Sequence, residues 1–421
     1  MVKILRTFRH FWYFVLNNKY RLYVIDSFFS FLSKVIDLLP KNNNLIVFGE
    51  KNGLWYGDNS KLVFEYLVSH SDKIECCWLT NSIKIYRQLK VNKLPVALTW
   101  SLKGIRKLFQ AKIGVYSNTL RDISFEPLFV PRKLKLIPLR HGKSVKRVIY
   151  AIKDFKKKEN PYRLFTYEKE YSQVAFTIST SPLVSKMTEE CMQIGIDKHR
   201  VTGYPRYDQF FKRSRVSKDS NSFLNNKEYD HVILYAPTWR NGLKETKFFP
   251  FSDFNPEELI DLLKINNAII IVRPHVNDLI IFPETKKYLE NLELISKGRI
   301  CLDSHHRFPD LYELLPHISI LFSDYSSIYH DFLLLNRPMF FIPYDYDWFN
   351  DQFGFLYNYK KKLPGGEIIS AQSMMLFLKD VFDGKDMFKQ KREQLRDEIH
   401  TYRDSNSSQR VAREIENILY S

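Results

Sequence analysis

Short apolar runs alternate with amphipathic segments along most of the chain after Pro40. Strand-like runs of the first half lie at 44–49, 74–80, 112–117, 135–139 and 175–180. A second series lies at 231–239, 267–275, 299–303, 318–324 and 338–345. Their β-branched and aromatic residues are continuous rather than alternating, which is typical of parallel strands buried on both faces. The pattern therefore predicts an α/β fold with two doubly wound, Rossmann-type domains that face a cleft.

Two segments interrupt the alternation and set the predicted domain limits. Residues 1–40 form an aromatic-rich N-terminal segment, and the stretch around 210–230 is polar and without a period. The prediction is an N-terminal domain over 41–210 and a C-terminal domain over 211–421. The C-terminal domain is expected to end in charged amphipathic helices.

The N-terminal segment has the pattern of an amphipathic helix. On a helix over 22–39, the polar residues from Asp26 to Asp37 fall on one stripe and the other positions are apolar. The charges in that run interrupt the roughly 20 apolar residues that a spanning helix needs, and no cleavage pattern of a signal peptide follows. Two interpretations stay open: a helix packed on the protein, or a helix lying on the membrane surface, which the basic residues upstream favour.

Charge and cysteine content narrow the classes of function. The chain has 64 Lys and Arg against 47 Asp and Glu, a net charge of +17. This excess favours anionic partners such as phosphate groups, nucleic acid or an acidic membrane face. No recognition helix or RNP-like strand is recognisable, so a nucleic-acid-binding protein is only a distant alternative. The four cysteines form no CxxC pair, so we expect buried thiols of a cytoplasmic protein and no zinc site.

Polar residues gather where the strands of the second half end. Ligands of doubly wound sheets bind outside the carboxyl ends of the strands. The residues at these positions are Thr238, Arg240, Arg273, His275, Ser323, Asp324, Ser326 and Ser327. Such a set suits a phosphate group, with Ser323 or Asp324 capping a helix through Ile328 whose free N–H groups bind the anion. The alternative is that these residues only cap the helix.

One histidine of the first half is a candidate general base. His141 follows a predicted strand and precedes Gly142 and Lys143. Histidine is the usual general base because an ordinary imidazole changes its charge near neutral pH. The alternative is an ordinary histidine of a surface loop. The sequence GYPRYD at 203–208 is predicted to form a turn that carries Arg206.

The ordered motifs RHGKSVK, GYPRYD, YAPTWR, RPH and SDYSSIYHDFLLLNRP resemble those of the CDP-glycerol glycerophosphotransferases of teichoic acid synthesis. The resemblance extends over roughly 45–370. It implies a GT-B fold and a peripheral enzyme at the cytoplasmic face of the membrane. The implied reaction moves glycerol phosphate, or ribitol phosphate, from a CDP-alditol to a hydroxyl of a lipid-linked acceptor and releases CMP. The product would be teichoic acid or a related cell-surface polymer such as a capsule.

The resemblance also implies roles for individual residues. By position, His141 is the proposed base and His275 contacts the donor pyrophosphate. Arg240, Ser326 and Ser327 match donor-binding positions of the family. Together with the residues found at strand ends and in loops, the predicted substrate-binding residues are Arg206, Thr238, Arg240, Arg273, Ser323, Asp324, Ser326, Ser327 and Lys143. The chain departs from the family pattern at Arg140, where the family usually has an aromatic residue, and in HGKSVK, where it has HGTPLK. Both departures lie in the loop that borders the acceptor side.

No cofactor is expected beyond the donor substrate, CDP-glycerol or CDP-ribitol. Asp324, Asp331 and Asp345 could bind Mg²⁺, but their spacing matches no known site, so no metal ligand is predicted. The alternative enzyme is a GT-B glycosyltransferase that uses a nucleotide sugar for a capsule or cell-wall glycan, because the same phosphate-binding rim would serve it.

Overall fold

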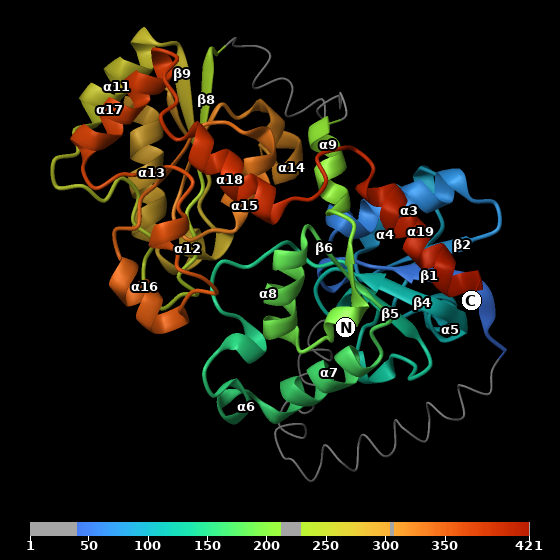
Figure 1. Cartoon of the computed structure of the whole chain (residues 1–421). Coiled ribbons are helices and arrows are strands. Elements are labelled where there is room, and N and C mark those ends of the chain that lie inside the picture. The colour runs from blue at the N-terminus through green and yellow to red at the C-terminus, as the bar shows by residue number, and fades with distance from the viewer. Residues whose placement is uncertain (1–39, 212–228, 304–306, 421) are drawn as a thin grey trace. The chain divides into compact units, whose positions relative to one another are not determined.

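The computed structural model describes residues 40–211, 229–303 and 307–420, which form two compact units (Figure 1). The predicted N-terminal helix and most of the predicted linker lie outside the described residues. Unit 1 contains residues up to 141 together with 149–208 and 406–421, and unit 2 contains 142–148 and 209–405. This division differs from the predicted one because the C-terminal segment belongs to unit 1 and the loop after His141 belongs to unit 2.

The described part of unit 1 is built on a five-stranded parallel sheet in the order β3-β2-β1-β4-β5. The strands are β1 (Asn42–Phe48), β2 (Glu75–Thr80), β3 (Val96–Leu98), β4 (Ala111–Tyr116) and β5 (Lys135–Pro138). Residues 45–48 of the central strand are fully buried because helices cover the sheet, as the continuous apolar runs predict. The strand order reverses between β1 and β4, which is where ligands of such sheets bind.

Serine and asparagine caps mark the starts of several helices of unit 1. The principal helices are α3 (Asp58–His70), α4 (Ile83–Val91), α5 (Leu102–Gln110), α6 (Phe155–Lys158), α7 (Pro161–Ser172) and α8 (Pro182–Met192). Ser82 caps α4 and Ser101 caps α5, each by accepting a backbone N–H bond. Ser60 does not cap α3: it is buried inside the helix, and its hydroxyl lies 3.0 Å from that of Ser117.

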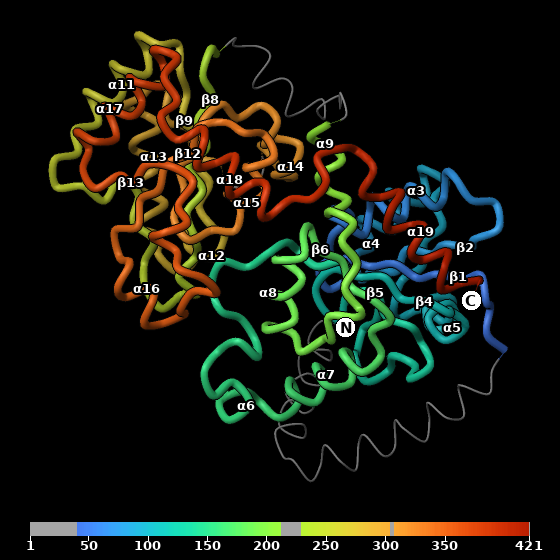
Figure 2. The backbone as a smooth tube through the Cα atoms, viewed as in Figure 1, coloured from blue at the N-terminus to red at the C-terminus, as the bar shows by residue number. Residues whose placement is uncertain are grey.

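The C-terminal helix completes unit 1. α19 (Ser407–Tyr420) packs against α3, and the trace in Figure 2 shows the two side by side. The Asp208 carboxylate caps α19 by accepting the backbone N–H groups of Ser407 (2.8 Å) and Ser408 (2.9 Å). The predicted strand at 175–180 forms β6 (Thr177–Ser179), which pairs with β7 (His199–Val201) in a separate two-stranded sheet.

Unit 2 repeats the architecture with a six-stranded parallel sheet in the order β10-β9-β8-β11-β12-β13, counted over the described residues. The strands are β8 (His231–Tyr235), β9 (Ala268–Val272), β10 (Ile300–Leu302), β11 (Ile320–Ser323), β12 (Met339–Phe341) and β13 (Gly366–Glu367). The principal helices are α11 (Pro256–Ile265), α12 (Val276–Ile281), α13 (Pro283–Ile295), α14 (Leu311–Leu314), α15 (Ile328–Phe332), α16 (Tyr346–Phe353), α17 (Ala371–Phe382) and α18 (Lys389–Ile399). Both units are therefore α/β folds with parallel sheets, and the predicted fold class is confirmed.

Two further features concern the cysteines and the helices. All four cysteines are buried, and none forms a disulfide. No helix of the described residues combines the length and the apolar character that crossing a membrane requires.

Candidate active site

His141 lies in a sharp turn directly after β5. The residues on either side have positive φ angles, 60° at Arg140 and 111° at Gly142, and glycine adopts this region without a Cβ clash. The buried Asn59 side chain holds the turn by donating to the carbonyl groups of Leu139 (3.2 Å) and Arg140 (2.6 Å). The turn leaves the His141 side chain 43% exposed at the carboxyl edge of the sheet.

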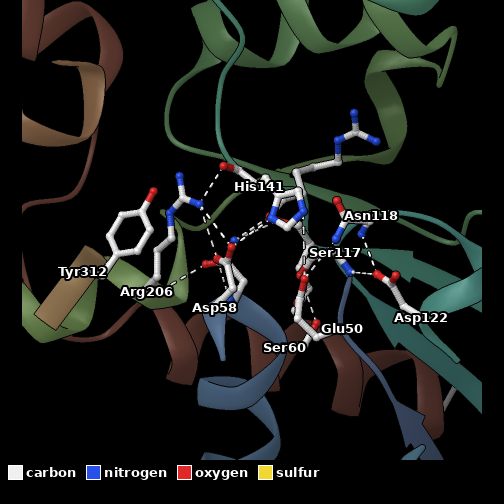
Figure 3. A network of polar contacts seen from close by, with 12 residues as sticks. Glu50, Asp58, Ser60, Ser117, Asn118, Asp122, His141, Arg206 and Tyr312 are labelled. Atoms are coloured by element: carbon white, nitrogen blue, oxygen red, sulfur yellow. Dashed lines mark hydrogen bonds and ion pairs between the residues drawn. The ribbon is translucent and has the colours of Figure 1, made fainter. Parts of the chain in front are cut away.

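Asp58, the first residue of α3, binds one ring nitrogen of His141. Its Oδ2 lies 2.9 Å from Nδ1 of the imidazole (Figure 3). Arg206 donates to Asp58 Oδ1 at 3.3 Å and to the His141 carbonyl at 2.6 Å. Burial raises the pKa of Asp58, but the Arg206 charge and the hydrogen bond from His141 outweigh it, so the pKa falls to about 2. The Asp58 carboxylate therefore favours the tautomer with a proton on Nδ1, which leaves Nε2 free to accept one.

Glu50 faces the other ring nitrogen. Its Oε1 lies 3.9 Å from Nε2 of His141 and accepts a hydrogen bond from Asn118 Nδ2 at 3.2 Å. The side chain is completely buried. Burial, followed by the negative charges of Asp58 and Asp122, raises the pKa of Glu50 well above its ordinary value and favours the neutral carboxyl. The imidazole thus lies between an ionised and a neutral carboxyl group.

The same three side chains also have the spacing of a small cation site. One ligand atom from each of Glu50, Asp58 and His141 lies within 4.8 Å of the others. The Arg206 guanidinium already neutralises Asp58, which weakens the attraction of this cluster for a cation. The arrangement suits proton transfer through His141.

A pocket of about 270 Å³ in unit 2 collects most of the residues predicted to hold phosphate. It lies at the carboxyl ends of β8, β9 and β11. Its polar lining includes Ser144, Lys146, Thr238, Trp239, Arg273, His275, Ser326 and Ser327. The structure thus brings together side chains that are more than a hundred residues apart in the sequence.

His275 is held in this pocket by two contacts. Its ring stacks on Trp239 with 4.6 Å between the ring centroids and 6° between the planes. Its Nδ1 accepts the backbone N–H of Asn277 at 3.2 Å, which caps α12. A neutral His275 therefore carries its proton on Nε2 and can donate it in a hydrogen bond to an anion.

Lys146 supplies a cation to the same lining. Burial, followed by the nearby Arg240 charge, lowers the pKa of Lys146. An anion bound in the pocket would therefore favour the charged ammonium group.

Comparisons with known proteins agree with this geometry. The family model described as CDP-glycerol:poly(glycerophosphate) glycerophosphotransferase matches residues 31–417. The chain belongs to this family.

Two relatives of this family member are similar over most of their lengths. The teichoic acid glycerol-phosphate transferase of Staphylococcus aureus is 26% identical over 391 residues, covering 91% of this chain and 95% of that protein. A teichoic acid poly(glycerol phosphate) polymerase of Bacillus spizizenii is 28% identical over 364 residues, covering 82% and 86% of the two chains.

Solved structures share the fold. The wall teichoic acid polymerase TagF has a TM-score of 0.72 at 20% identity, covering 100% of this chain and 98% of that one. A UDP-GlcNAc 2-epimerase of Neisseria meningitidis has a TM-score of 0.50 at 13% identity, covering 90% and 99%. These likenesses confirm the predicted GT-B-like fold class.

In this glycerophosphotransferase, several of the residues predicted to bind substrate are buried, and three of them surround the base of the unit 2 loops. Arg240 is completely buried and forms ion pairs with Asp324 at 2.6 Å and Asp345 at 2.9 Å. Asp324 also accepts the backbone N–H of Thr238 at 2.7 Å, which ties the loop after β8 to the loop after β11. The Ser323 hydroxyl is buried as well and donates to the backbone carbonyl at position 236. The structure thus gives Arg240 and Asp324 a positioning role behind the pocket.

The predicted helix cap after β11 is wrong. Ser323 ends the strand, and Asp324 bonds to the loop after β8 instead of to the helix. α15 begins after Ser327, whose side chain makes no capping bond, and it spans only five residues before a 3₁₀ turn. The Ser326 and Ser327 side chains remain in the pocket lining.

One other expectation needs correction. The Lys143 side chain is buried, with Nζ 3.2 Å from His330 Nε2 and 4.3 Å from the centre of the Tyr357 ring, so Lys146 lines the pocket in its place. Among the described residues, the candidate Mg²⁺ ligands Asp324, Asp331 and Asp345 form no three-ligand cluster.

Sequence reasoning missed the partners of His141. Glu50 and Asp58 follow β1 in the run GEKNGLWYGDNS, just as the predicted phosphate-binding residues of the second half follow their strands. Applying the strand-end rule to β1 would have found them. Their pairing with His141 and Arg206, however, joins segments about 80 and 150 residues away in the chain.

Proposed function

We propose that this family member transfers glycerol phosphate from CDP-glycerol to a hydroxyl group of a teichoic acid acceptor and releases CMP. The observation that carries the proposal is the His141–Asp58 pair. It provides a histidine with a fixed tautomer and a side chain that is 43% exposed at a sheet edge. A family that uses an alcohol as its nucleophile needs such a base.

The reaction requires one proton transfer and one displacement at phosphorus. Nε2 of His141 accepts the proton of the acceptor hydroxyl while its oxygen attacks the β-phosphorus of CDP-glycerol. A new P–O bond forms, and the bond between the β-phosphorus and the bridging oxygen breaks. CMP leaves with the electron pair of that bond, and Asp58 stabilises the imidazolium that results.

Unit 2 supplies the groups that stabilise the leaving phosphate. His275 donates from Nε2, the hydroxyl groups of Ser326 and Ser327 donate from the opposite loop, and Lys146 contributes positive charge. These donors suit the charge that develops on the pyrophosphate as CMP departs. Ribitol phosphate would use the same donor groups, because the CDP part of the two donors is identical.

We also propose that the enzyme acts as a peripheral protein at the cytoplasmic face of the membrane. Three considerations support this location: its donor is a soluble nucleotide, its acceptor is expected to be lipid-linked, and the chain carries a net charge of +17. Whether the polymer product is teichoic acid or a capsule depends on which acceptor the enzyme prefers.

Product analysis tests the reaction. The full chain is incubated with CDP-glycerol, CDP-ribitol or UDP-GlcNAc together with a soluble acceptor that ends in glycerol phosphate. We expect CMP from CDP-glycerol, and His141→Ala should lower its rate by about 10²–10⁴-fold. The Lys157 side chain is 86% exposed, so Lys157→Ala provides the matched control and should leave the rate unchanged. Release of UDP from the nucleotide sugar without CMP formation would overturn the proposal in favour of a glycosyltransferase.

A further inference from the structure

Three neighbouring loops of unit 1 expose large apolar side chains at the carboxyl edge of its sheet. We name this group, Leu54, Ile83, Trp100 and Leu102, the apolar rim. These residues follow β1, β2 and β3, and Leu102 is 89% exposed while Trp100 is 50% exposed. Isolated exposed apolar residues are ordinary, but an exposed group on adjacent loops marks an interaction site.

The three loops are joined by hydrogen bonds, so the apolar rim is one surface. The backbone N–H of Asn81 donates to the Gly53 carbonyl at 2.7 Å, and its side chain donates to the Asn52 carbonyl at 2.7 Å. The backbone N–H of Thr99 donates to the Thr80 carbonyl at 3.0 Å. These bonds connect each loop to the next one across the sheet.

Helix caps fix the positions of the apolar rim. Ser82 accepts a backbone bond in α4 immediately before Ile83, and Ser101 accepts one in α5 between Trp100 and Leu102. Both helices therefore begin with an apolar side chain directed away from the sheet's core. The capped starts of the two helices therefore hold these side chains in their exposed positions.

The surroundings of the apolar rim are strongly cationic. No acidic residue occurs between Cys76 and Arg121, a stretch that contains nine Lys and Arg residues. Exposed cations next to the rim are Lys51, Lys84, Arg87 and Lys103. Among the described residues none of these four forms an ion pair.

We infer that the apolar rim and its cations are a docking surface for an anionic lipid bilayer. Apolar tips enter the boundary between headgroups and acyl chains, where tryptophan is enriched, and the cations bind anionic headgroups. A polyanion such as nucleic acid would use the cations but leave Leu54 and Leu102 in water. The combination of both features therefore favours a bilayer.

The position of the apolar rim deepens the proposed function, on which this inference rests. Leu54 lies four residues before Asp58, and the backbone N–H of Asn52 donates to the Asp122 carboxylate at 2.7 Å beside the His141 site. The rim and His141 also share the carboxyl edge of one sheet. Docking through the rim would hold the base close to the bilayer surface that carries a lipid-linked acceptor.

Vesicle flotation of the full chain tests the inference. We expect binding to vesicles of phosphatidylglycerol and phosphatidylcholine in equal amounts, and weaker binding to phosphatidylcholine alone. The double variant Trp100→Ser/Leu102→Ser should lower the partition coefficient at least about tenfold. The matched control is Val91→Ser, because Val91 is 80% exposed at the other end of α4. Lys84→Glu/Lys103→Glu should abolish the preference for the anionic vesicles.

A second measurement does not depend on affinity. Brominated phospholipids should quench the tryptophan fluorescence of the bound protein, and Trp100→Phe should remove part of that quenching while binding persists. Unchanged partition in the double variant, or unchanged quenching in Trp100→Phe, overturns the inference. Binding of the wild-type chain to neither vesicle also overturns it and points to a protein partner.

Activity separates this inference from the proposed function. Both rim variants should release CMP with the soluble acceptor at the wild-type rate, since neither changes a residue of the His141 site. If CMP release is normal but flotation is unchanged in the variants, the docking inference fails and the proposed function stands. If the wild-type chain floats as expected but releases no CMP, the proposed function fails instead.

Discussion

Replacing Asp58 with asparagine tests whether a fixed tautomer makes His141 a base. The carboxylate accepts the Nδ1 proton at 2.9 Å. The asparagine amide can instead donate a hydrogen bond from its Nδ2 to Nδ1 of His141. The ring proton of His141 would then lie on Nε2, which is the atom that must accept the proton of the acceptor hydroxyl. Because Asp58 has a φ of 54°, which asparagine tolerates well, the backbone should be preserved.

The expected loss follows from the two functions of the carboxylate. Losing a charge-assisted hydrogen bond costs about 1.5–3 kcal/mol, or roughly 10- to 150-fold in rate. Blocking Nε2 removes general base catalysis as well, which is typically worth about 10²–10⁴-fold. Asp58→Asn should therefore lower kcat/KM by about 10²–10⁴-fold. Asp58→Ala, which leaves the tautomer free, should lower it only about 10- to 150-fold.

The assay measures CMP release over a pH series with the soluble acceptor. At each pH, kcat/KM of Asp58→Asn and Asp58→Ala is compared with that of the wild type, which gives the two losses directly. Thermal unfolding of each variant controls for the loss of the Arg206 ion pair. Wild-type activity in folded Asp58→Asn, or greater damage in Asp58→Ala than in Asp58→Asn, would refute the argument.

Three other expectations can be checked on the same protein. Arg240→Met should lower the free energy of unfolding in urea by about 3–5 kcal/mol, because Asp324 and Asp345 would remain buried without their cation. Burial raises the pKa of Glu170 to about 8 in the folded protein. The neutral carboxyl therefore contributes its full stability at pH values below the pKa that Glu170 has in the unfolded chain, and this contribution is lost as the pH rises to about 8. Glu170→Gln keeps an acceptor for the Tyr116 hydroxyl and should be more stable than the wild type at pH 9 by about 3–5 kcal/mol, measured by urea unfolding. EDTA should leave CMP release unchanged, and a rise of more than about tenfold on adding Mg²⁺ would reassign the carboxyl groups around His141 to a cation.

The pocket of unit 2 was predicted more completely than the cluster around His141. Strand ends of unit 2 carry their polar residues in short motifs, so the strand-end rule found Thr238, His275 and the serine pair at once. It could not tell that Arg240 is buried, because its partner carboxylates come from residues 324 and 345. The sequence around an arginine is the same whether its guanidinium binds substrate or connects two loops through ion pairs.

The sequence alone determined the alternating elements, the parallel sheets and the order of motifs that places the chain in its family. These depend on local periodicity and on side chains at strand ends, which neighbours in the chain define. Only the tertiary structure decided that Asp58 and Glu50 flank His141, that Lys146 rather than Lys143 lines the pocket, and that α19 completes unit 1. Those outcomes depend on the order of the strands and on how far each one extends, because these bring together side chains that no local pattern connects.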